Sequence, residues 1–130
     1  MKQQKVKNLY RKIGLIMRTL IAIHKMFWFA ILCLFTFPML GIWRVCFNKT
    51  DFFHLIPKTF HILTGKIFQI KIEVIGSPSQ EHAIYLGNHL SYIDIPVIGS
   101  ILDATFIAKQ DVKGWPIFGW LAFLAETIFI

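Results

Sequence analysis

Acidic residues are absent from the first fifty positions of this chain, and their absence restricts the partners of the N-terminal region. Asp51 is the first acidic side chain, whereas seven basic residues occur by position 25. These are Lys2, Lys5, Lys7, Arg11, Lys12, Arg18 and Lys25. The net charge of the 130 residues is +7, which favours an anionic partner. Because no nucleic-acid-reading motif accompanies the charge, we expect an anionic membrane surface and no nucleic acid.

Charged residues of either sign are absent from Met26 to Trp43. This apolar run is slightly shorter than the roughly 20 residues that a simple membrane-spanning helix needs, and Pro38 and Gly41 interrupt it. Two structures fit: a kinked single span, or a bent hairpin that enters one leaflet and returns. We favour the hairpin, because a single span with a cytoplasmic N-terminus would place the following residues outside the cell. No small-residue cleavage site follows the run, which argues against a secretory signal peptide.

Cysteines are scarce, and their spacing excludes two classes of structure. Cys33 and Cys46 form no CxxC pair, so we expect neither a disulfide framework nor a zinc site. His54 and His61 are seven positions apart and would share one face of a helix. A metal could bind there, but two histidines without a third ligand are more typical of an interface, and we expect no metal.

Apolar side chains recur with helical spacing between the N-terminal basic residues. They are Leu9, Ile13, Ile16, Leu20 and Ile23. The whole chain is 55% hydrophobic, with a mean hydropathy of +0.58. A basic amphipathic segment that leads into an apolar one is typical of a membrane-surface element, so we expect membrane lipids as partners and a membrane location.

The rest of the chain alternates helix and strand patterns. We expect helices over 51–66, 91–102 and 114–124, and strands over 68–74, 82–86, 105–108 and 127–130. Such alternation predicts the α/β class, with a partly parallel sheet. We therefore divide the chain into a membrane-anchoring helical region, 1–66, and the N-terminal part of an α/β domain, 67–130.

The run Gly87-Asn88-His89-Leu90-Ser91-Tyr92-Ile93-Asp94 places a histidine and a carboxylate five positions apart after a predicted strand. An imidazole at the end of a strand can accept a hydroxyl proton if a carboxylate holds its other nitrogen. Five residues on an ideal helix leave side chains roughly 140° apart, so His89 must lie in the turn before the helix to meet Asp94. The same residues also fit a helix-capping box, Ser91-x-x-Asp94.

A second segment, Phe106 to Trp120, contains Ala108-Lys109 and Pro116-x-x-Gly119. Together with Asn88-His89-x-Ser91-x-x-Asp94, it resembles the glycerolipid acyltransferase family, in particular the 1-acyl-glycerol-3-phosphate acyltransferases. The resemblance is specific from about residue 84 to 130 and general before that. The apolar N-terminal region looks like the family's membrane anchor.

The resemblance implies a reaction and a role for each motif residue. His89 would be the general base on the hydroxyl of lysophosphatidate, and Asp94 would orient it. The acyl donor would be acyl-CoA or acyl-carrier protein as co-substrate, with no cofactor, no acyl-enzyme intermediate and a cytoplasmic catalytic side. Lys109 would either meet the substrate phosphate or be a solvated surface lysine. The remaining motif residues would shape the site: Asn88, Ser91, Pro116 and Gly119.

Two blocks of the family pattern are not found in these 130 residues: a Glu-Gly-Thr-Arg-type segment and a later proline block. We therefore expect a truncated acyltransferase domain that is inactive by itself. Two alternatives stay open. The chain could be a non-catalytic membrane-associated remnant, or it could pair with a separately encoded C-terminal half.

Overall fold

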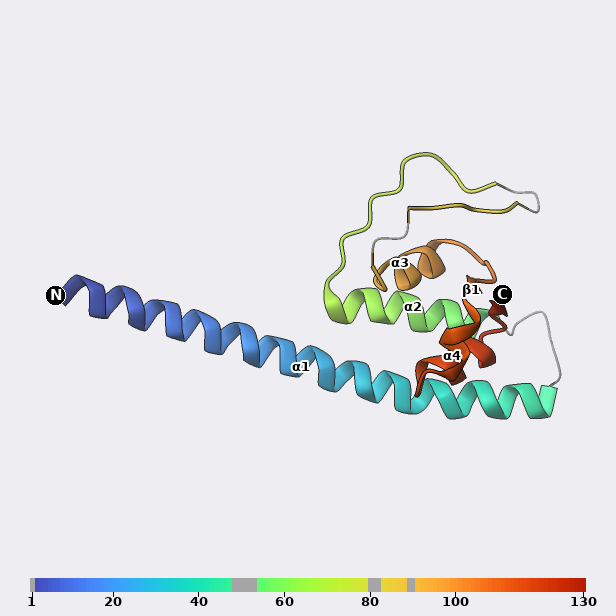
Figure 1. Ribbon diagram of the computed structural model, residues 1–130, viewed down its shortest axis with the longest axis horizontal. Helices are drawn as coiled ribbons and strands as arrows, with labels where there is room; N and C mark the ends of the chain where they lie inside the picture. Colours follow the sequence, from blue (N-terminus) through green and yellow to red (C-terminus); the bar gives the residue numbers. More distant parts are fainter. Residues whose placement is uncertain (1, 48–53, 80–82, 89–90) are drawn as a thin grey trace.

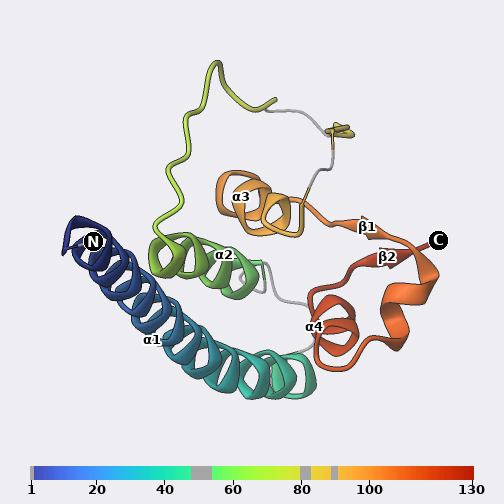
Figure 2. The same cartoon turned by 60° about the vertical axis from the view of Figure 1, so that its left-hand side comes forward.

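The chain is mostly helical in the computed structural model, which describes residues 2–47, 54–79, 83–88 and 91–130 (Figures 1 and 2). The helices are α1 (Lys2–Phe47), α2 (Leu55–Phe68), α3 (Asp94–Ile101) and α4 (Phe118–Leu124), with a 3₁₀ helix η1 (Gln110–Gly114) before α4. Two short strands, β1 (Ile107–Ala108) and β2 (Ile128–Phe129), complete the described elements. The expected α/β class is therefore not clearly shown.

Helix α1 is one continuous helix of 46 residues that includes Pro38. The favoured hairpin between residues 26 and 43 is therefore wrong. A proline inside a helix removes one backbone hydrogen bond, but packing just beyond it holds the chain helical, since Leu40 is only 1% exposed. Helix α1 is also long and apolar enough to cross a membrane, by length and composition alone.

The buried core joins three helices. Leu40 of α1, Ile56 of α2 and Leu124 of α4 form its centre, and Trp43 and Leu121 pack against it. Aromatic contacts continue this interface along α1, where Phe29 lies 6.1 Å from Phe60 and 5.5 Å from Phe68 between ring centroids. Because the start of α2 meets residue 40 and its end meets residue 29, the two helices run antiparallel, as Figure 2 shows.

Helix α2 begins later than expected and ends later, at Phe68. The expected cap, Asp51, lies outside the described residues. Pro57 is tolerated because it lies in the first turn of α2, where backbone N–H groups have no partner within the helix.

Strands β1 and β2 pair in parallel, with Ile107 opposite Ile128 and Ala108 opposite Phe129. The N–H of Gln110 also donates to the Ile130 carbonyl, at 2.8 Å. The connection between the strands consists of η1 and α4, so the expected parallel strands near 105–108 and 127–130 are present in shortened form.

The other two expected strands are not seen. Residue 68 ends α2, and the described parts of 70–79 and 83–88 are extended without a strand ladder. The hydroxyl of Tyr85 accepts a hydrogen bond from the Ser79 N–H at 3.0 Å, which links the two segments. Alternating apolar residues favour an extended backbone, but a strand also needs a neighbouring backbone to pair with.

Candidate active site

A hydrogen-bonded turn holds the start of α3. The carboxylate of Asp94 accepts a hydrogen bond from the Ser91 N–H at 3.0 Å, and the Asp94 N–H donates to the Ser91 carbonyl at 3.0 Å. The Ser91 hydroxyl accepts from the Ile93 N–H at 3.3 Å. These contacts satisfy N–H groups that a helix start leaves without partners, and the carboxylate lies near the positive end of the helix dipole. The Asp94 half of the predicted capping box is thus present, whereas Ile93 rather than Ser91 directly precedes the helix, without a side-chain cap.

His89 lies outside the described residues. Asn88, directly before it, is exposed, and Ser91, two residues after it, begins the turn. Helix α3 starts at Asp94 rather than at the expected residue 91, so position 89 precedes the helix by several residues. A carboxylate has about four acceptor sites, so accepting the Ser91 N–H leaves Asp94 chemically able to orient an imidazole as well.

Lys109 follows β1 directly and is largely exposed. Its ammonium pairs with the carboxylate of Asp111, and both side chains are more than two-thirds exposed. An exposed ion pair contributes only about 0–1 kcal/mol to stability. The pair can therefore open readily to admit an anionic group.

The Pro116–Gly119 turn is tightly built. The Phe118 N–H donates to the Pro116 carbonyl at 2.7 Å, which forms a γ-turn centred on Ile117. Ile117 has a φ of 65°, a strained value for a β-branched residue. A Cβ added at Gly119 would lie 2.3 Å from the Lys113 carbonyl oxygen, so α4 approaches η1 more closely than any other residue would allow.

An aromatic pair joins the two motif segments. The rings of Tyr92 and Trp115 meet edge to face, with centroids 5.7 Å apart. Tyr92 lies inside the Ser91–Asp94 turn, and Trp115 directly precedes Pro116. The contact brings the two turns together, whereas Lys109 pairs with Asp111 rather than with Asp94. Neither aromatic residue is a specified position of the motifs, so only the fold reveals this contact.

His61 supports α3 from the α2 side. Its ring packs so closely on Gly99 that an added Cβ would lie 2.3 Å from the imidazole. The ring also meets Phe106 edge to face, and its Nδ1 is buried without a hydrogen-bond partner. Burial lowers the pKa of His61 from 6.5 to about 4, so the imidazole is neutral at pH 7. His61 thus lies in the contact between α2 and α3, whereas His54 is exposed.

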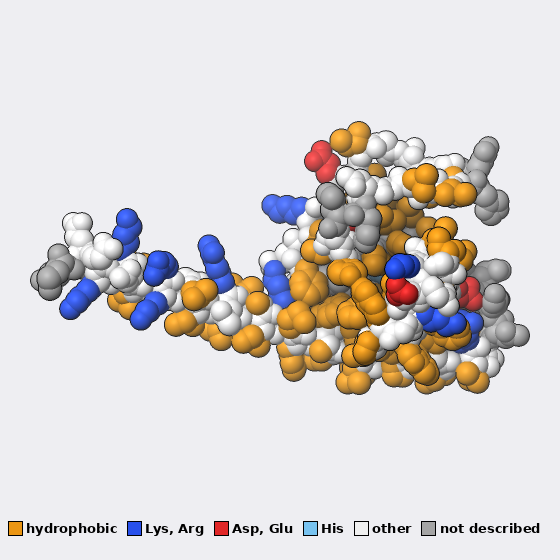
Figure 3. All heavy atoms as spheres, in the orientation of Figure 1, with side chains coloured by type: hydrophobic (Ala, Val, Ile, Leu, Met, Phe, Trp, Pro, Cys, Tyr) orange, Lys and Arg blue, Asp and Glu red, His pale blue; other side chains and the backbone are white. Residues whose placement is uncertain are grey.

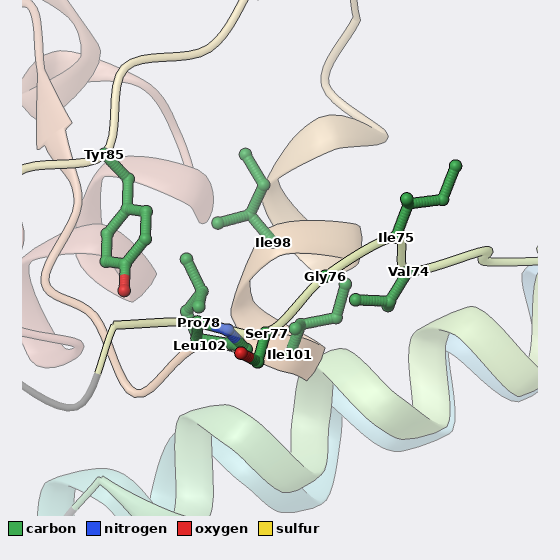
Figure 4. Close-up of a pocket in the computed structure, with 9 residues that line it drawn as sticks. All are labelled: Val74, Ile75, Gly76, Ser77, Pro78, Tyr85, Ile98, Ile101 and Leu102. Carbon is green, nitrogen blue, oxygen red and sulfur yellow. The ribbon is translucent and has the colours of Figure 1, made fainter.

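An open apolar hollow of about 230 Å³ lies between α3 and the extended residues before it (Figure 4). Ile98, Ile101 and Leu102 form one wall, and Tyr85 with residues 74–78 forms the other. Ile98 is one turn beyond Asp94, so the hollow begins on the same face of α3 as the carboxylate. Its lining suits a hydrocarbon group.

No group of three or more His, Cys, Asp or Glu side chains that could hold a metal ion occurs in the described part of the chain. Both cysteines are free thiols.

The segment that carries both motifs is similar in sequence to known proteins. Residues 71–130 match the family model described as Acyltransferase. Over this segment, a little under half of the chain, the sequence is similar to glycerolipid acyltransferases. All of the predicted site residues fall inside the matched range.

Three curated relatives illustrate the acyltransferase similarity. The chain is 37% identical over 76 residues to the lyso-ornithine lipid O-acyltransferase of Rhizobium meliloti (strain 1021), a match covering 58% of this chain and 26% of that protein. It is 38% identical over 60 residues to a Pseudomonas aeruginosa protein of the same name, a match covering 46% of this chain and 23% of that protein. It is 37% identical over 59 residues to the 1-acyl-sn-glycerol-3-phosphate acyltransferase of Neisseria gonorrhoeae, a match covering 43% of this chain and 23% of that protein.

The matched segment spans about a quarter of the length of these curated acyltransferases. No solved structure matches the chain.

Proposed function

We propose that this acyltransferase segment supplies the general base for acyl transfer from acyl-CoA or acyl-carrier protein to the hydroxyl of a lysolipid. The observation that carries the proposal is the family match over 71–130, which contains His89 and the Ser91–Asp94 turn. In this reaction His89 takes the hydroxyl proton while the hydroxyl oxygen bonds to the thioester carbonyl carbon. The C–S bond then breaks, and the proton passes to the leaving thiolate.

In this proposal Asp94 is a positioning residue. Its backbone and carboxylate are fixed by Ser91, at the N-terminus of α3. From there the carboxylate would hold the imidazole of His89 in the tautomer that accepts a proton and would stabilise its charged form. Lys109, which is exposed and paired with the exposed Asp111, would meet the phosphate of the acceptor.

Lysophosphatidate is the acceptor that we propose first. A lyso-ornithine lipid is a second candidate, because the match to the Rhizobium meliloti enzyme of that name covers 58% of this chain, against 43% for the Neisseria gonorrhoeae glycerolipid enzyme. Either acceptor places the reaction at a membrane, where its acyl chain resides. Soluble thioester donors place the catalytic side in the cytoplasm.

A chimaera tests the proposed chemistry directly. Residues 71–130 replace the corresponding segment of the Neisseria gonorrhoeae enzyme, and membranes containing the chimaera receive acyl-CoA with lysophosphatidate or a lyso-ornithine lipid. We expect acyl transfer to lysophosphatidate. Failure of a membrane-incorporated chimaera to acylate either lipid would contradict the proposal.

The 130-residue chain by itself is expected to give no transfer, because no Glu-Gly-Thr-Arg-type segment is present in it to hold the acceptor. A separately encoded C-terminal half would restore activity when expressed with it. Activity of the 130 residues alone, lost on His89→Ala, would show instead that the first two motif segments suffice.

A further inference from the structure

Half of the eight basic residues of α1 lie along one side of the helix. On an ideal helix, four of them fall within about 40° of one another. These four, the basic stripe, are Lys7, Arg11, Arg18 and Lys25. Lys5 and Lys12 lie to one side of the stripe, about 120–140° from its centre. Figure 3 shows Lys and Arg side chains projecting from the part of α1 that extends beyond the rest of the molecule.

The opposite side of α1 is mainly apolar and uncovered from Leu9 onward. Its five N-terminal members are between 47% and 60% exposed. They are Leu9, Ile13, Ile16, Leu20 and Ile23. The same side continues through the C-terminal half of α1, where Leu34, Phe35, Ile42 and Val45 are between 62% and 85% exposed. We call this side the apolar face of α1.

Contacts with α2 and α4 show which way the apolar face points. The ammonium of Lys25, in the basic stripe, donates to the Phe68 carbonyl at the end of α2 (3.3 Å) and to the Gln69 side chain (3.1 Å). Thr36 and Leu40, which are buried, fall on the same side of α1 as the stripe. The stripe therefore faces the side that carries the other helices, and the apolar face points away from them.

This arrangement argues against a helix that spans the bilayer. A span would take α2 into the hydrocarbon, since α2 packs along the C-terminal half of α1. It would carry the ion pair between Lys58 and Asp103 with it, at great cost. The 46 residues of α1 would also extend about 69 Å, against a hydrocarbon thickness of about 30 Å.

We propose that α1 lies in the plane of an anionic membrane surface along its whole length. Its apolar face enters the boundary of the acyl chains, and its basic side chains lie in the layer of lipid phosphates. The rest of the molecule then rests on the water-facing side of that helix. The absence of acidic residues from α1 makes an anionic surface the complementary partner. This inference is independent of the acyl-transfer proposal, because its evidence is confined to the anchor.

Vesicle binding by the full 130-residue chain tests the anionic preference. Flotation is measured with phosphatidylcholine vesicles and with vesicles containing phosphatidylglycerol. The variant Lys12→Glu/Arg18→Glu is compared with Lys71→Glu/Lys113→Glu, which makes the same charge change at exposed positions outside α1. We expect the first variant to bind anionic vesicles about thirtyfold or more weakly, with neutral vesicles unaffected, and the second to match the parent. Equal binding by both variants would overturn the proposal.

Site-directed spin labelling tests the in-plane geometry of α1. Single cysteines are placed in turn at positions 7–20 after replacement of Cys33 and Cys46, and accessibility to oxygen is compared with that to a polar reagent. We expect the ratio to oscillate every 3.6 residues, greatest at positions 9, 13, 16 and 20. A ratio that rises and falls once along the helix would establish a span. A uniformly low ratio, with sedimentation as a dimer and no vesicle binding, would assign the apolar face to a second copy. Either result would overturn the proposal.

Discussion

Asp94 combines an observed structural contact with a proposed chemical one. Its carboxylate accepts the Ser91 N–H at the start of α3, and the same group is proposed to orient His89. The sequence pattern Ser91-x-x-Asp94 predicts the first contact, because capping depends on residues close along the chain. The second depends on the placement of His89, which lies outside the described residues.

The variants Asp94→Asn and Ser91→Ala separate these two contacts. Asparagine keeps an acceptor for the Ser91 N–H but removes the charge, so we expect transfer by the chimaera to fall about 10²-fold or more, with little loss of stability. Alanine at position 91 removes the hydroxyl that accepts the Ile93 N–H, so we expect stability to fall by about 0.5–2 kcal/mol with transfer largely kept. Transfer rates and thermal unfolding measure both. An active Asp94→Asn chimaera would restrict Asp94 to capping.

Lys109→Ala tests whether this lysine meets the acceptor phosphate. Loss of a charge-assisted hydrogen bond is expected to raise KM for lysophosphatidate about tenfold or more, with kcat nearly unchanged. Stability should hardly change, because the ion pair with Asp111 is exposed. Steady-state kinetics of the chimaera measure the effect, with Lys113→Ala as the matched control. An unchanged KM would make Lys109 a solvated surface lysine.

At the scale of elements, close packing places the two motif turns. Gly119 lets α4 approach η1, and Gly99 lets α3 approach α2 through His61. Sequence periodicity predicts helices near these positions but not which glycine faces a neighbour. The same limit explains the wrong expectations. Alternation over 68–74 suggests a strand without naming its partner, and Pro38 suggests a break without revealing that Leu40 is buried beyond it.

The variant Gly119→Ala tests the contact between α4 and η1. Its Cβ would lie 2.3 Å from the Lys113 carbonyl oxygen, a backbone atom that cannot swing aside. We expect a loss of about 1–3 kcal/mol in the free energy of unfolding, measured by chemical denaturation. The control is Gly114→Ala, where the added Cβ meets nothing within 4 Å. Equal stability of the two variants would show that η1 and α4 separate easily.

His61 gives the contact between α2 and α3 a pH dependence. Its pKa is about 4 in the folded chain and near 6.5 when unfolded, so between these values the unfolded state binds more protons. Stability is therefore fully present above pH 6.5 and falls as the pH drops towards 4, by about 3 kcal/mol at most. We expect His61→Leu to remove this slope, and exposed His54→Gln to retain it, in unfolding free energies measured from pH 7 to pH 4. A slope that survives His61→Leu would assign it to other groups.

At the scale of the whole molecule, the helix that we propose to contact the membrane also contributes to the core beside the motif segments. The C-terminal half of α1 forms part of the core with α2 and α4, so the anchor and the motif segments are rigidly connected. Composition alone predicts contact with lipid. It does not distinguish a span from a surface helix, because that distinction depends on which face of α1 the other helices cover.

The most direct test of the proposed chemistry is the rate of acyl transfer to lysophosphatidate by the chimaera with and without His89→Ala. We expect the substitution to lower kcat by about 10²–10⁴-fold while membrane incorporation and unfolding stay unchanged, since a general base contributes that much to rate. A His89→Ala chimaera that transfers acyl groups at the parent rate would contradict the assignment of His89 as the base.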